Sequence, residues 1–326
     1  MTKQINIRPR AAVKVPASTA NLGPGFDTLG MALNLFAWIE MKPSSETQIH
    51  LYGDEMNDIP CDKSNLIYKV AQTVFAEAGV AVPELEISMY SDIPLARGLG
   101  SSAAAIIGGM VCANALIGNP LSQDRIFTLA TALEKHPDNV GASLFGGIVV
   151  TVWNGERAEH IRLEPHPALE VLAAIPEFHL ETEKARHVLP QSVSMQDAVF
   201  NVSHSSLLVA ALASGKLPLI RQAMKDKLHQ PYRAALVPGM KAILENATEY
   251  GALGVALSGA GPTLLALVDG QGVHKVQLEQ FLLDTLQREG ITAATLRLKP
   301  NAEGAVVLPE PAQQSFMELV KGEMGV

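Results

Sequence analysis

Hydrophobic and polar positions along the first part of the chain predict strands that alternate with a helix. Residues 11–15 are strand-like and are expected to end at Pro16, and residues 84–89 alternate between apolar and polar side chains, as strands do. Residues 33–41 form a longer apolar run before a polar turn. Residues 65–78 carry apolar side chains three and four positions apart, which is helical spacing, and Gly79 suits the position just past a helix end. This order indicates a fold of mixed helices and strands.

Two more helices are expected next. One begins at Ser101, directly after a glycine-rich stretch, and the other runs from Ser122, a suitable N-cap, to Glu134. The first is apolar over residues 103–118, but this run is too short to span a bilayer and contains Asn114. It therefore predicts a helix buried in a protein core, and no membrane segment is expected.

The second half of the chain predicts a β–α–β–β–α–β order. Its expected strands are residues 171–175, 254–257, 263–268 and 291–298, and its expected helices are residues 201–213, 217–228, 239–250 and 273–289. With the helices between the first two strands counted as one layer, this order is the split-βαβ plan. Charges and prolines interrupt the apolar runs around residues 155–167, so we expect two domains, residues 1–160 and 161–326. A last helical run, residues 313–321, has no assigned role.

Composition and charge narrow the class of partner. The chain has 326 residues, and its 25 basic and 33 acidic side chains give a net charge of −8. No segment gathers Lys and Arg, so no nucleic-acid partner is expected. An acidic protein that binds an anion must collect positive potential locally, from helix N-termini, single arginines or a metal ion.

The cysteines and the N-terminus indicate a cytoplasmic protein. Cys61 and Cys112 are far apart in sequence, which gives neither metal-ligand spacing nor a disulfide framework and suits a reducing compartment. Residues 1–10 are polar and do not have the pattern of a signal peptide.

The glycine-rich stretch before Ser101 is the first candidate site. A strand, then glycines at 98 and 100, then a helix, is the arrangement that binds anions, because the first N–H groups of a helix have no partners within it. Ser101 and Ser102 add hydroxyls for phosphate oxygens or Mg²⁺. The loop is neither a Lys-bearing phosphate loop nor a dinucleotide fingerprint. Taken alone, phosphate binding and a plain core helix are equally good interpretations.

Three further segments carry polar groups that are open to two interpretations. Residues 15–27 include Asn21 and Asp27 and form either an ordinary turn or a loop that binds a substrate, with Asp27 opposite a cation. Residues 257–263 form either a hairpin connection, the favoured interpretation, or a second backbone surface over a phosphate. Residues 134–141 contain Glu134, which either ligates Mg²⁺ or serves turn and capping chemistry.

Taken jointly, these motifs resemble those of the GHMP kinase superfamily. The segments 15–27, 94–103 and 258–263 occur in the same order as its three motifs, and the likeness extends to about residue 298. His-Pro-Asp-Asn-Val at 136–140 and Gln-Pro-Tyr-Arg at 230–233 favour the branch that phosphorylates L-homoserine. The resemblance implies an α+β fold with an N-terminal domain like the second domain of ribosomal protein S5 and a ferredoxin-like C-terminal domain.

The resemblance also implies roles for individual residues. The ATP phosphates would bind along Pro94, Leu95, Ala96, Arg97, Gly98, Leu99, Gly100, Ser101 and Ser102. Asn65 would lie near the adenine, and Gly259 and Gly261 would join the ATP surface. Ser102 and Glu134 would reach Mg²⁺.

On the acceptor side, Asp27 would pair with the ammonium group of L-homoserine. Thr182, Arg186 and Arg233 would bind the rest of the amino acid, with the two arginines on its carboxylate; guanidinium suits that group because it can form two parallel hydrogen bonds with it. Asn21 would lie near the reacting hydroxyl, and His136 and Asn139 would line the same pocket. Thr182 and Arg186 share one face if their segment is helical, although Thr182 is also a candidate N-cap.

The expected reaction is transfer of the γ-phosphoryl group of ATP to the hydroxyl of L-homoserine, a step that leads to threonine. We expect no dedicated general base; a Lys14–Asp138 pair, of the kind some relatives use, is the conceivable exception. The alternatives are a kinase for mevalonate or a sugar, and a catalytically silent relative that binds ATP or an amino acid. A nicotinamide oxidoreductase is disfavoured because the acidic ribose partner is missing. A homodimer is left open.

Overall fold

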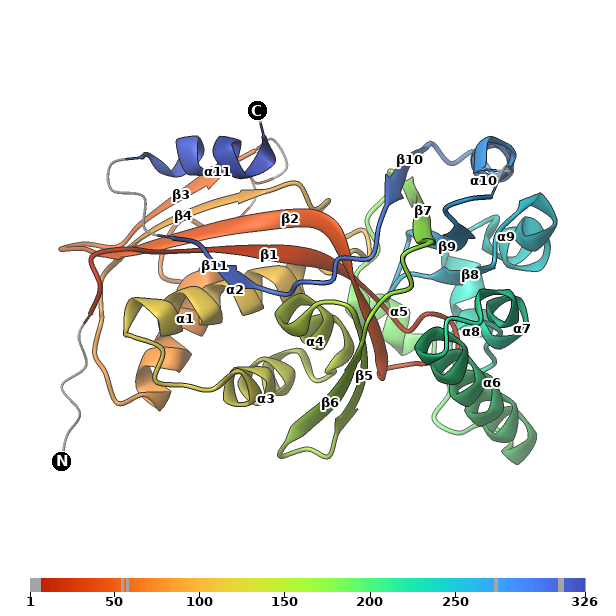
Figure 1. The fold of residues 1–326 in the computed structure, drawn as a ribbon, viewed down its shortest axis with the longest axis horizontal. Helices are drawn as coiled ribbons and strands as arrows, with labels where there is room; N and C mark the ends of the chain where they lie inside the picture. Colours follow the sequence, from red (N-terminus) through yellow and green to blue (C-terminus); the bar gives the residue numbers. More distant parts are fainter. Residues whose placement is uncertain (1–6, 54–55, 57–58, 273–274, 310–313, 326) are drawn as a thin grey trace.

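The computed structural model describes residues 7–53, 56, 59–272, 275–309 and 314–325, which form two β-sheets with helices packed against them (Figure 1). The first sheet has seven strands in the order β11-β1-β2-β4-β3, with β5 pairing with β2 and β6 with β5. Its strands are β1 Ala11–Ala20, β2 Leu29–Pro43, β3 Gln48–Tyr52, β4 Leu85–Ser91, β5 Ile148–Trp153, β6 Ala158–Leu163 and β11 Val306–Val307.

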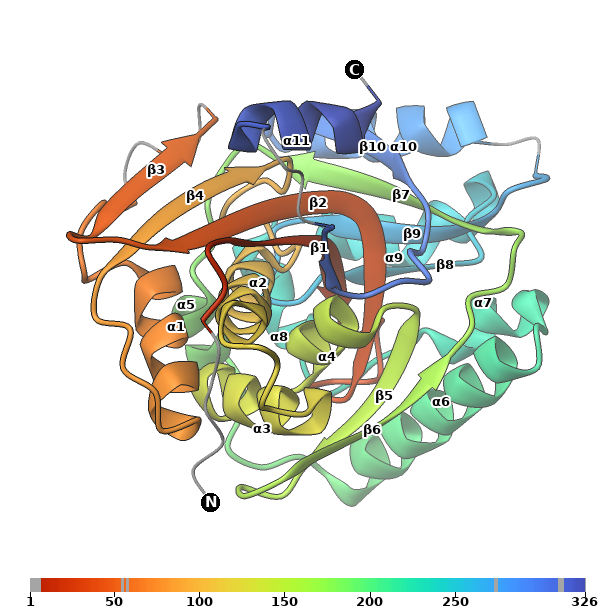
Figure 2. The same cartoon turned by 60° about the vertical axis from the view of Figure 1, so that its left-hand side comes forward.

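Four helices cover one face of this sheet, and a fifth lies on the other face (Figures 1 and 2). The four are α1 Leu66–Glu77, α2 Ser101–Leu116, α3 Gln123–Glu134 and α4 Asp138–Phe145, and the fifth is α11 Phe316–Met324. As expected from its composition, α2 is surrounded by the core: 13 of its 16 residues are buried. This burial fixes the direction of α2, so its N-terminus stays at one edge of the sheet, where the second domain begins.

The second sheet confirms the split-βαβ plan. Its four strands are β7 Leu169–Pro176, β8 Gly254–Leu257, β9 Leu264–Asp269 and β10 Ala293–Leu298, in the antiparallel order β10-β7-β9-β8. Side chains alternate along β7: Val171 and Ala173 face the core that α6 and α7 share, and Leu172 and Ala174 face the core of α9 and α10. These helices are α6 Met195–Ala213, α7 Ile220–Ala223, α9 Met240–Asn246 and α10 Lys275–Arg288. Two further short helices are α5 Thr182–His187 and α8 Gln230–Arg233, and α8 lies near α7 and β8 in Figure 1.

Two expectations about single elements were wrong, and one strand was not expected. The first strand does not end at Pro16, because its pairing with β2 continues through an irregularity between Pro16 and Ala17. The unexpected strand is β6, which lies within the segment 155–167 and forms a hairpin with β5. The helix expected over 217–228 ends at Ala223, because the Asp226 carboxylate accepts hydrogen bonds from the backbone N–H groups of residues 228, 229 and 230 and holds the chain in another conformation.

The division into two domains between residues 160 and 161 stays a proposal. Two features of the strand pairing bear on it. The division falls inside β6, all of which pairs with β5 of the first sheet. After β10 the chain returns to that sheet, where β11 pairs with β1, and α11 packs over Trp38. Positions 273 and 313, where two predicted helices begin, lie outside the described residues. Among the helices of the described residues, none is long and apolar enough to cross a membrane.

Candidate active site

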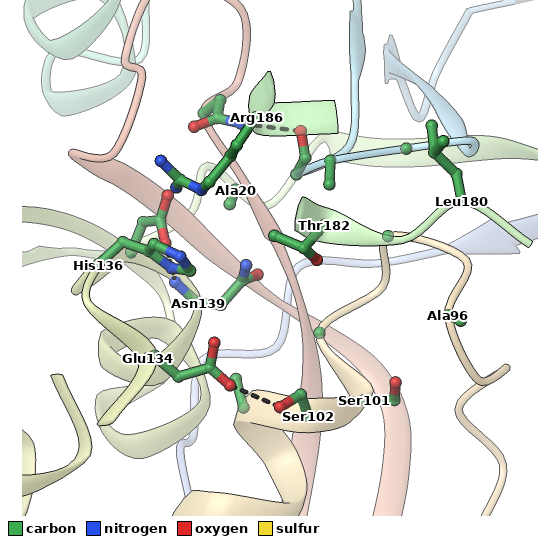
Figure 3. Close-up of a pocket in the computed structure, with 18 of the residues that line it drawn as sticks. Ala20, Ala96, Ser101, Ser102, Glu134, His136, Asn139, Leu180, Thr182 and Arg186 are labelled. Carbon is green, nitrogen blue, oxygen red and sulfur yellow. Dashed lines mark hydrogen bonds between the residues drawn. The ribbon is translucent and has the colours of Figure 1, made fainter. Parts of the chain in front are cut away.

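A cavity of about 270 Å³ lies where the two domains meet, and its wall contains parts of all the predicted motifs (Figure 3). It runs from Ser102 and Glu134 at one end to Arg186 at the other, with His136, Asn139 and Thr182 between them. The lining residues are Ala20, Asn21, Asp27, Ala96, Gly98, Gly100, Ser101, Ser102, Ala103, Glu134, His136, Asp138, Asn139, Leu180, Glu181, Thr182, Arg186, Arg233, Gly259, Ala260 and Gly261.

The N-terminus of α2 opens directly into this cavity. Its N-cap is Gly100, in the left-handed conformation with φ 72°, and no side chain caps the first N–H groups. Ser101 and Ser102 follow in the first turn and line the cavity. Uncapped N–H groups, the helix dipole and two hydroxyls together make an anion site, so the predicted strand–loop–helix geometry is confirmed. The interpretation of phosphate binding stays a prediction.

The glycines of the loop allow the three motifs to touch. A Cβ on Gly98 would lie 2.4 Å from the carbonyl oxygen of Ser258, so only glycine fits between the loop and the β8–β9 turn. The Ser258 hydroxyl donates to the Gly98 carbonyl at 2.5 Å, and its oxygen lies 2.8 Å from Thr19 Oγ1, within hydrogen-bond distance. The loop, β1 and the turn after β8 are therefore one interlocked unit.

Ser102 and Glu134 form the pair predicted for a metal ion. The Ser102 hydroxyl donates to Glu134 Oε1 at 2.6 Å, and both side chains line the cavity. Within the described ranges, no three His, Cys, Asp or Glu side chains gather in a metal-binding group. A hydroxyl and one carboxylate fit Mg²⁺, which takes its remaining oxygen ligands from phosphates and water.

At the other end of the cavity, Asp27 and Arg186 are part of its wall and bind each other. Two hydrogen bonds join them, at 2.6 Å between Nη2 and Oδ1 and at 3.1 Å between Nη1 and Oδ2, a bidentate geometry. Arg233 is buried, with 1% exposure, and donates to the carbonyl oxygens of Ala185 and Gly259, both at 3.0 Å. Burial lowers the pKa of Arg233 to about 10, which leaves the guanidinium charged at neutral pH.

Asn21 holds the loop that carries Asp27. Its Oδ1 accepts from the Asp27 N–H at 3.0 Å, and its Nδ2 donates to the Gly259 carbonyl at 3.0 Å. Asn21 and Asp27 both adopt left-handed backbone conformations, with φ of 73° and 54°. The side chain therefore has a clear structural task, and its predicted role at the reacting hydroxyl stays a prediction.

His136, Asp138 and Asn139 come together at the start of α4. Burial lowers the pKa of His136, and the nearby positive charge of Arg186 lowers it further, so the imidazole is neutral at pH 7. Burial also raises the pKa of Asp138 to about 7, with the negative charge of Asp27 adding to the effect. Asn139 Oδ1 accepts from the hydroxyl of Ser18 at 3.0 Å, which ties this group to β1.

Several predicted residues lie outside the cavity. Asn65 is buried as the N-cap of α1, where its Oδ1 accepts from the Ile67 N–H at 2.8 Å, so its side chain does not face the site. Pro94 and Leu95 line a separate hollow of about 440 Å³ beside the end of β4. Two other loop residues also point elsewhere: Arg97 Nη1 donates to the Pro176 carbonyl at 2.6 Å, and Leu99 is buried at 1% exposure.

The segment around Thr182 is helical, as one interpretation required. Thr182 begins α5 and lies four residues before Arg186, and both line the cavity. The alternative role of Thr182 as an N-cap was wrong, because Glu181 occupies that position.

Lys14 is far from Asp138, so the conceivable Lys14–Asp138 pair does not exist. Lys14 lies on the face of the first sheet that α11 covers, with its Nζ 3.1 Å from Glu323 and 4.4 Å from the centroid of the Phe36 ring. Asp138 begins α4, on the opposite face.

Replacing Lys14 with methionine is therefore expected to leave turnover within about twofold of the unchanged protein, because an ion pair this exposed contributes little. Initial-rate kinetics would measure it. A hundredfold loss of kcat in a folded Lys14→Met variant would contradict the assignment to the outer face.

Three residues behind the cavity wall were not predicted from the sequence. His229 and Phe26 contact Arg233, and Ser18 forms a hydrogen bond with Asn139. One signal was available: His229 and Arg233 are four residues apart, immediately around the Gln-Pro-Tyr-Arg segment, and so share a face if that segment is helical.

Comparison with known proteins matches both halves of the chain to one family. The family described as GHMP kinases N terminal domain matches residues 65–147, and GHMP kinases C terminal matches residues 208–279. The homoserine kinase of Moorella thermoacetica is 46% identical over 296 residues, which covers 91% of this chain and 99% of that protein. The homoserine kinase of Deinococcus radiodurans is 44% identical over 295 residues, or 90% and 96% of the two chains.

Solved structures give the same architecture. The homoserine kinase from Cytophaga hutchinsonii superposes with a TM-score of 0.82 at 26% identity, covering 94% of this chain and 100% of that one. The mevalonate kinase of Methanococcus jannaschii, at 17% identity and a TM-score of 0.63 over 91% and 99% of the chains, shares the fold. The predicted two-domain α+β fold is thus confirmed.

Proposed function

The chain belongs to the homoserine kinases, a branch of the GHMP kinase family, and from this premise we propose that it phosphorylates the side-chain hydroxyl of L-homoserine. ATP supplies the phosphoryl group, and the product is O-phospho-L-homoserine, on the route to threonine. One observation carries the proposal: a single cavity joins the uncapped N-terminus of α2 to a set of two arginines and one aspartate. The first end suits phosphates and the second an amino-acid zwitterion.

The ATP side of the proposal rests on α2 and its neighbours. Backbone N–H groups of the first turn and the hydroxyls of Ser101 and Ser102 would bind phosphate oxygens, with Gly259 and Gly261 facing them across the cavity. The hollow beside Pro94 and Leu95 would bind the adenine ring of ATP. Ser102 and Glu134 would hold Mg²⁺, which when bound neutralises charge on the phosphates.

The acceptor side rests on matched charges. The ammonium group of L-homoserine would pair with Asp27, and its carboxylate would bind Arg186 and Arg233. Thr182, His136 and Asn139 lie between these charges and the α2 end, so a side chain of two methylenes would carry the hydroxyl toward the phosphates. Binding would exchange the contact between Asp27 and Arg186 for two contacts with the zwitterion.

In the proposed reaction the hydroxyl oxygen of L-homoserine forms a bond to the γ-phosphorus, and the bond from that phosphorus to the bridging oxygen of ADP breaks. Such a transfer has a loose transition state, so orientation and charge neutralisation supply most of the catalysis. The hydroxyl proton passes to a phosphoryl oxygen without a dedicated base. His136, held neutral, can form hydrogen bonds at this point without adding charge.

The proposal without a base predicts the outcome of two substitutions. Asp138→Asn and His136→Ala are each expected to lower kcat by no more than about tenfold, since a general base typically contributes a hundredfold or more. The pKa of Asp138, about 7, makes this a demanding test, because such a carboxylate is well suited to act as a base. Initial rates in folded variants decide; a fall of several thousandfold in either would establish a base.

An ADP-release assay with L-homoserine, mevalonate and galactose tests the function. We expect turnover with L-homoserine, and we expect Asp27→Ala to lower its kcat/KM by about a hundredfold, since the ammonium loses its counter-charge. Glu183→Ala removes the same charge from an exposed position on α5 outside the cavity and should change little. Turnover of mevalonate or galactose that Asp27→Ala does not affect would support the sugar or mevalonate alternative. No ADP release with any acceptor would support the silent relative.

We place the protein in the cytoplasm, where ATP is available. Cys61 is exposed and Cys112 buried, and both are free thiols, which suits a reducing compartment. A homodimer stays a proposal.

A further inference from the structure

Behind the acceptor end of the cavity lies a cluster of Phe26, Asp226, His229 and Arg233, in which Phe26 is partly exposed and the other three side chains are buried. His229 is completely buried, and the carboxylate of Asp226 beside it is buried as well. Of the four, only Arg233 lines the cavity. The other three therefore act on any ligand through Arg233 and through the loop that carries Asp27.

The contacts of His229 determine its protonation. Its Nε2 lies 2.8 Å from the carbonyl oxygen of Gly23, which only accepts hydrogen bonds, so Nε2 carries the hydrogen and donates. Its Nδ1 lies 3.2 Å from Nη1 of Arg233, which only donates, so Nδ1 accepts with its lone pair. A neutral imidazole with hydrogen on Nε2 satisfies both contacts at once. Burial lowers the pKa of His229, which also favours the neutral form.

Phe26 completes the link. Its ring stacks on the His229 ring, with centroids 5.1 Å apart and an angle of 27° between the planes. The guanidinium carbons of Arg186 and Arg233 lie 5.4 Å and 5.3 Å from the same ring centroid, within the range of cation–π contacts. One aromatic ring, next in sequence to Asp27, thus orders both arginines.

The loop over residues 21–27 needs such support. Asn21, Leu22 and Asp27 have left-handed φ angles of 73°, 46° and 54°, which cost free energy in any residue other than glycine. Besides the His229 contact at Gly23, Asn201 Nδ2 donates to the carbonyl of Pro24 at 2.8 Å. The second domain therefore holds this loop of the first from behind.

We propose that His229 is a positioning residue for the acceptor. By bonding to Gly23 on one side and to Arg233 on the other, it fixes the loop that bears Asp27 relative to the buried guanidinium. The carboxylate and the guanidinium are then held at the separation that the two charges of an amino acid require. This inference rests on the proposed function, and it assigns the selection of amino-acid acceptors to a residue that touches no substrate.

Two substitutions separate the two hydrogen bonds. His229→Asn keeps an oxygen near the Nδ1 position for Arg233 but cannot reach Gly23, and His229→Gln places an N–H near the Nε2 position but loses the acceptor for Arg233. Each is expected to raise KM for L-homoserine about tenfold, as the loss of one hydrogen bond to or beside a charged group does. His229→Phe keeps the stacking and loses both bonds, and should raise KM about a hundredfold. In all three, KM for ATP and kcat should stay within about threefold.

His204→Gln is the matched control, because His204 also stacks on a phenylalanine, Phe200, but lies on α6 away from the cavity. It should leave both KM values unchanged. Thermal denaturation reports folding, and Phe26→Leu, at a partly exposed position, tests the same link if the His229 variants do not fold. KM for L-homoserine within twofold of the parent in folded His229→Phe, or an equal rise in KM for ATP, would overturn the proposal.

Calorimetric titration of L-homoserine distinguishes the failure of this inference from the failure of the proposed function. A parent protein that binds L-homoserine without turning it over removes the proposed function, while the positioning role is still read from the Kd values of the variants. A parent protein that turns over L-homoserine, with variants of unchanged Kd and KM, keeps the function and removes the positioning role. A parent protein that does not bind L-homoserine overturns both.

Discussion

Arg233→Lys is expected to lower kcat/KM for L-homoserine by about a hundredfold or more, while KM for ATP changes by less than threefold. The guanidinium of Arg233 is buried and donates to two carbonyl oxygens and to His229 while it faces the cavity. An ammonium group keeps the charge but has only three N–H groups, too few to make these three bonds and also donate to a carboxylate, whereas a guanidinium has five. The loss of a buried, hydrogen-bonded charge contact typically lowers affinity by this amount or more.

Arg288→Lys provides the control, because Arg288 is an exposed residue at the end of α10. It should leave both kinetic constants and the thermal midpoint unchanged. If Arg233→Lys folded normally and kept its KM for L-homoserine, Arg233 would not bind the acceptor, and the carboxylate would depend on Arg186 alone.

Gly98→Ala is expected to raise KM for ATP about a hundredfold and to lower the thermal midpoint. Its Cβ would lie 2.4 Å from the carbonyl oxygen of Ser258 and 2.9 Å from that of Gly261, and both are backbone atoms that cannot rotate away. The loop and the β8–β9 turn must then separate, which displaces the N-terminus of α2. A misplacement of about 1 Å at a reacting group can cost about a hundredfold in rate.

Gly79→Ala isolates the part of this effect that comes from backbone conformation. Gly79 has φ +69°, close to the +81° of Gly98, but no atom lies within 4 Å of its Cβ position. This control should lose about 1–2 kcal/mol of stability and keep its KM for ATP. Equal kinetic effects of the two substitutions would show that the contact between the loop and the turn does not matter for ATP.

Local signals in the sequence predicted most elements of the fold. Asn65 followed by apolar residues at helical spacing predicted α1, and the structure gives Asn65 the capping task that its residue type favours. The β5–β6 hairpin could have been predicted from Asn154-Gly155 between two alternating runs, a turn signal that was interpreted as part of a domain boundary.

Long-range pairing is the part that the sequence could not provide. Asp27 and Arg186 are 159 residues apart, and nothing in either segment specifies that these two charges meet. The sequence predicted that each of the two side chains binds a charged group of the ligand. Their hydrogen bonds to each other appear only in the structure. The tautomer of His229 is a similar case, because it depends on Gly23 and Arg233, which approach it from two domains.

The return of residues 306–324 to the first sheet affects how the protein folds during synthesis. Val307 pairs with Val13, and α11 covers an aromatic surface around Trp38. At about 5–20 residues per second, β1 leaves the ribosome roughly 15–60 s before its second partner strand, β11, is made. Throughout that interval Trp38 and its aromatic neighbours are uncovered, so we expect the nascent first domain to be a client of cellular chaperones.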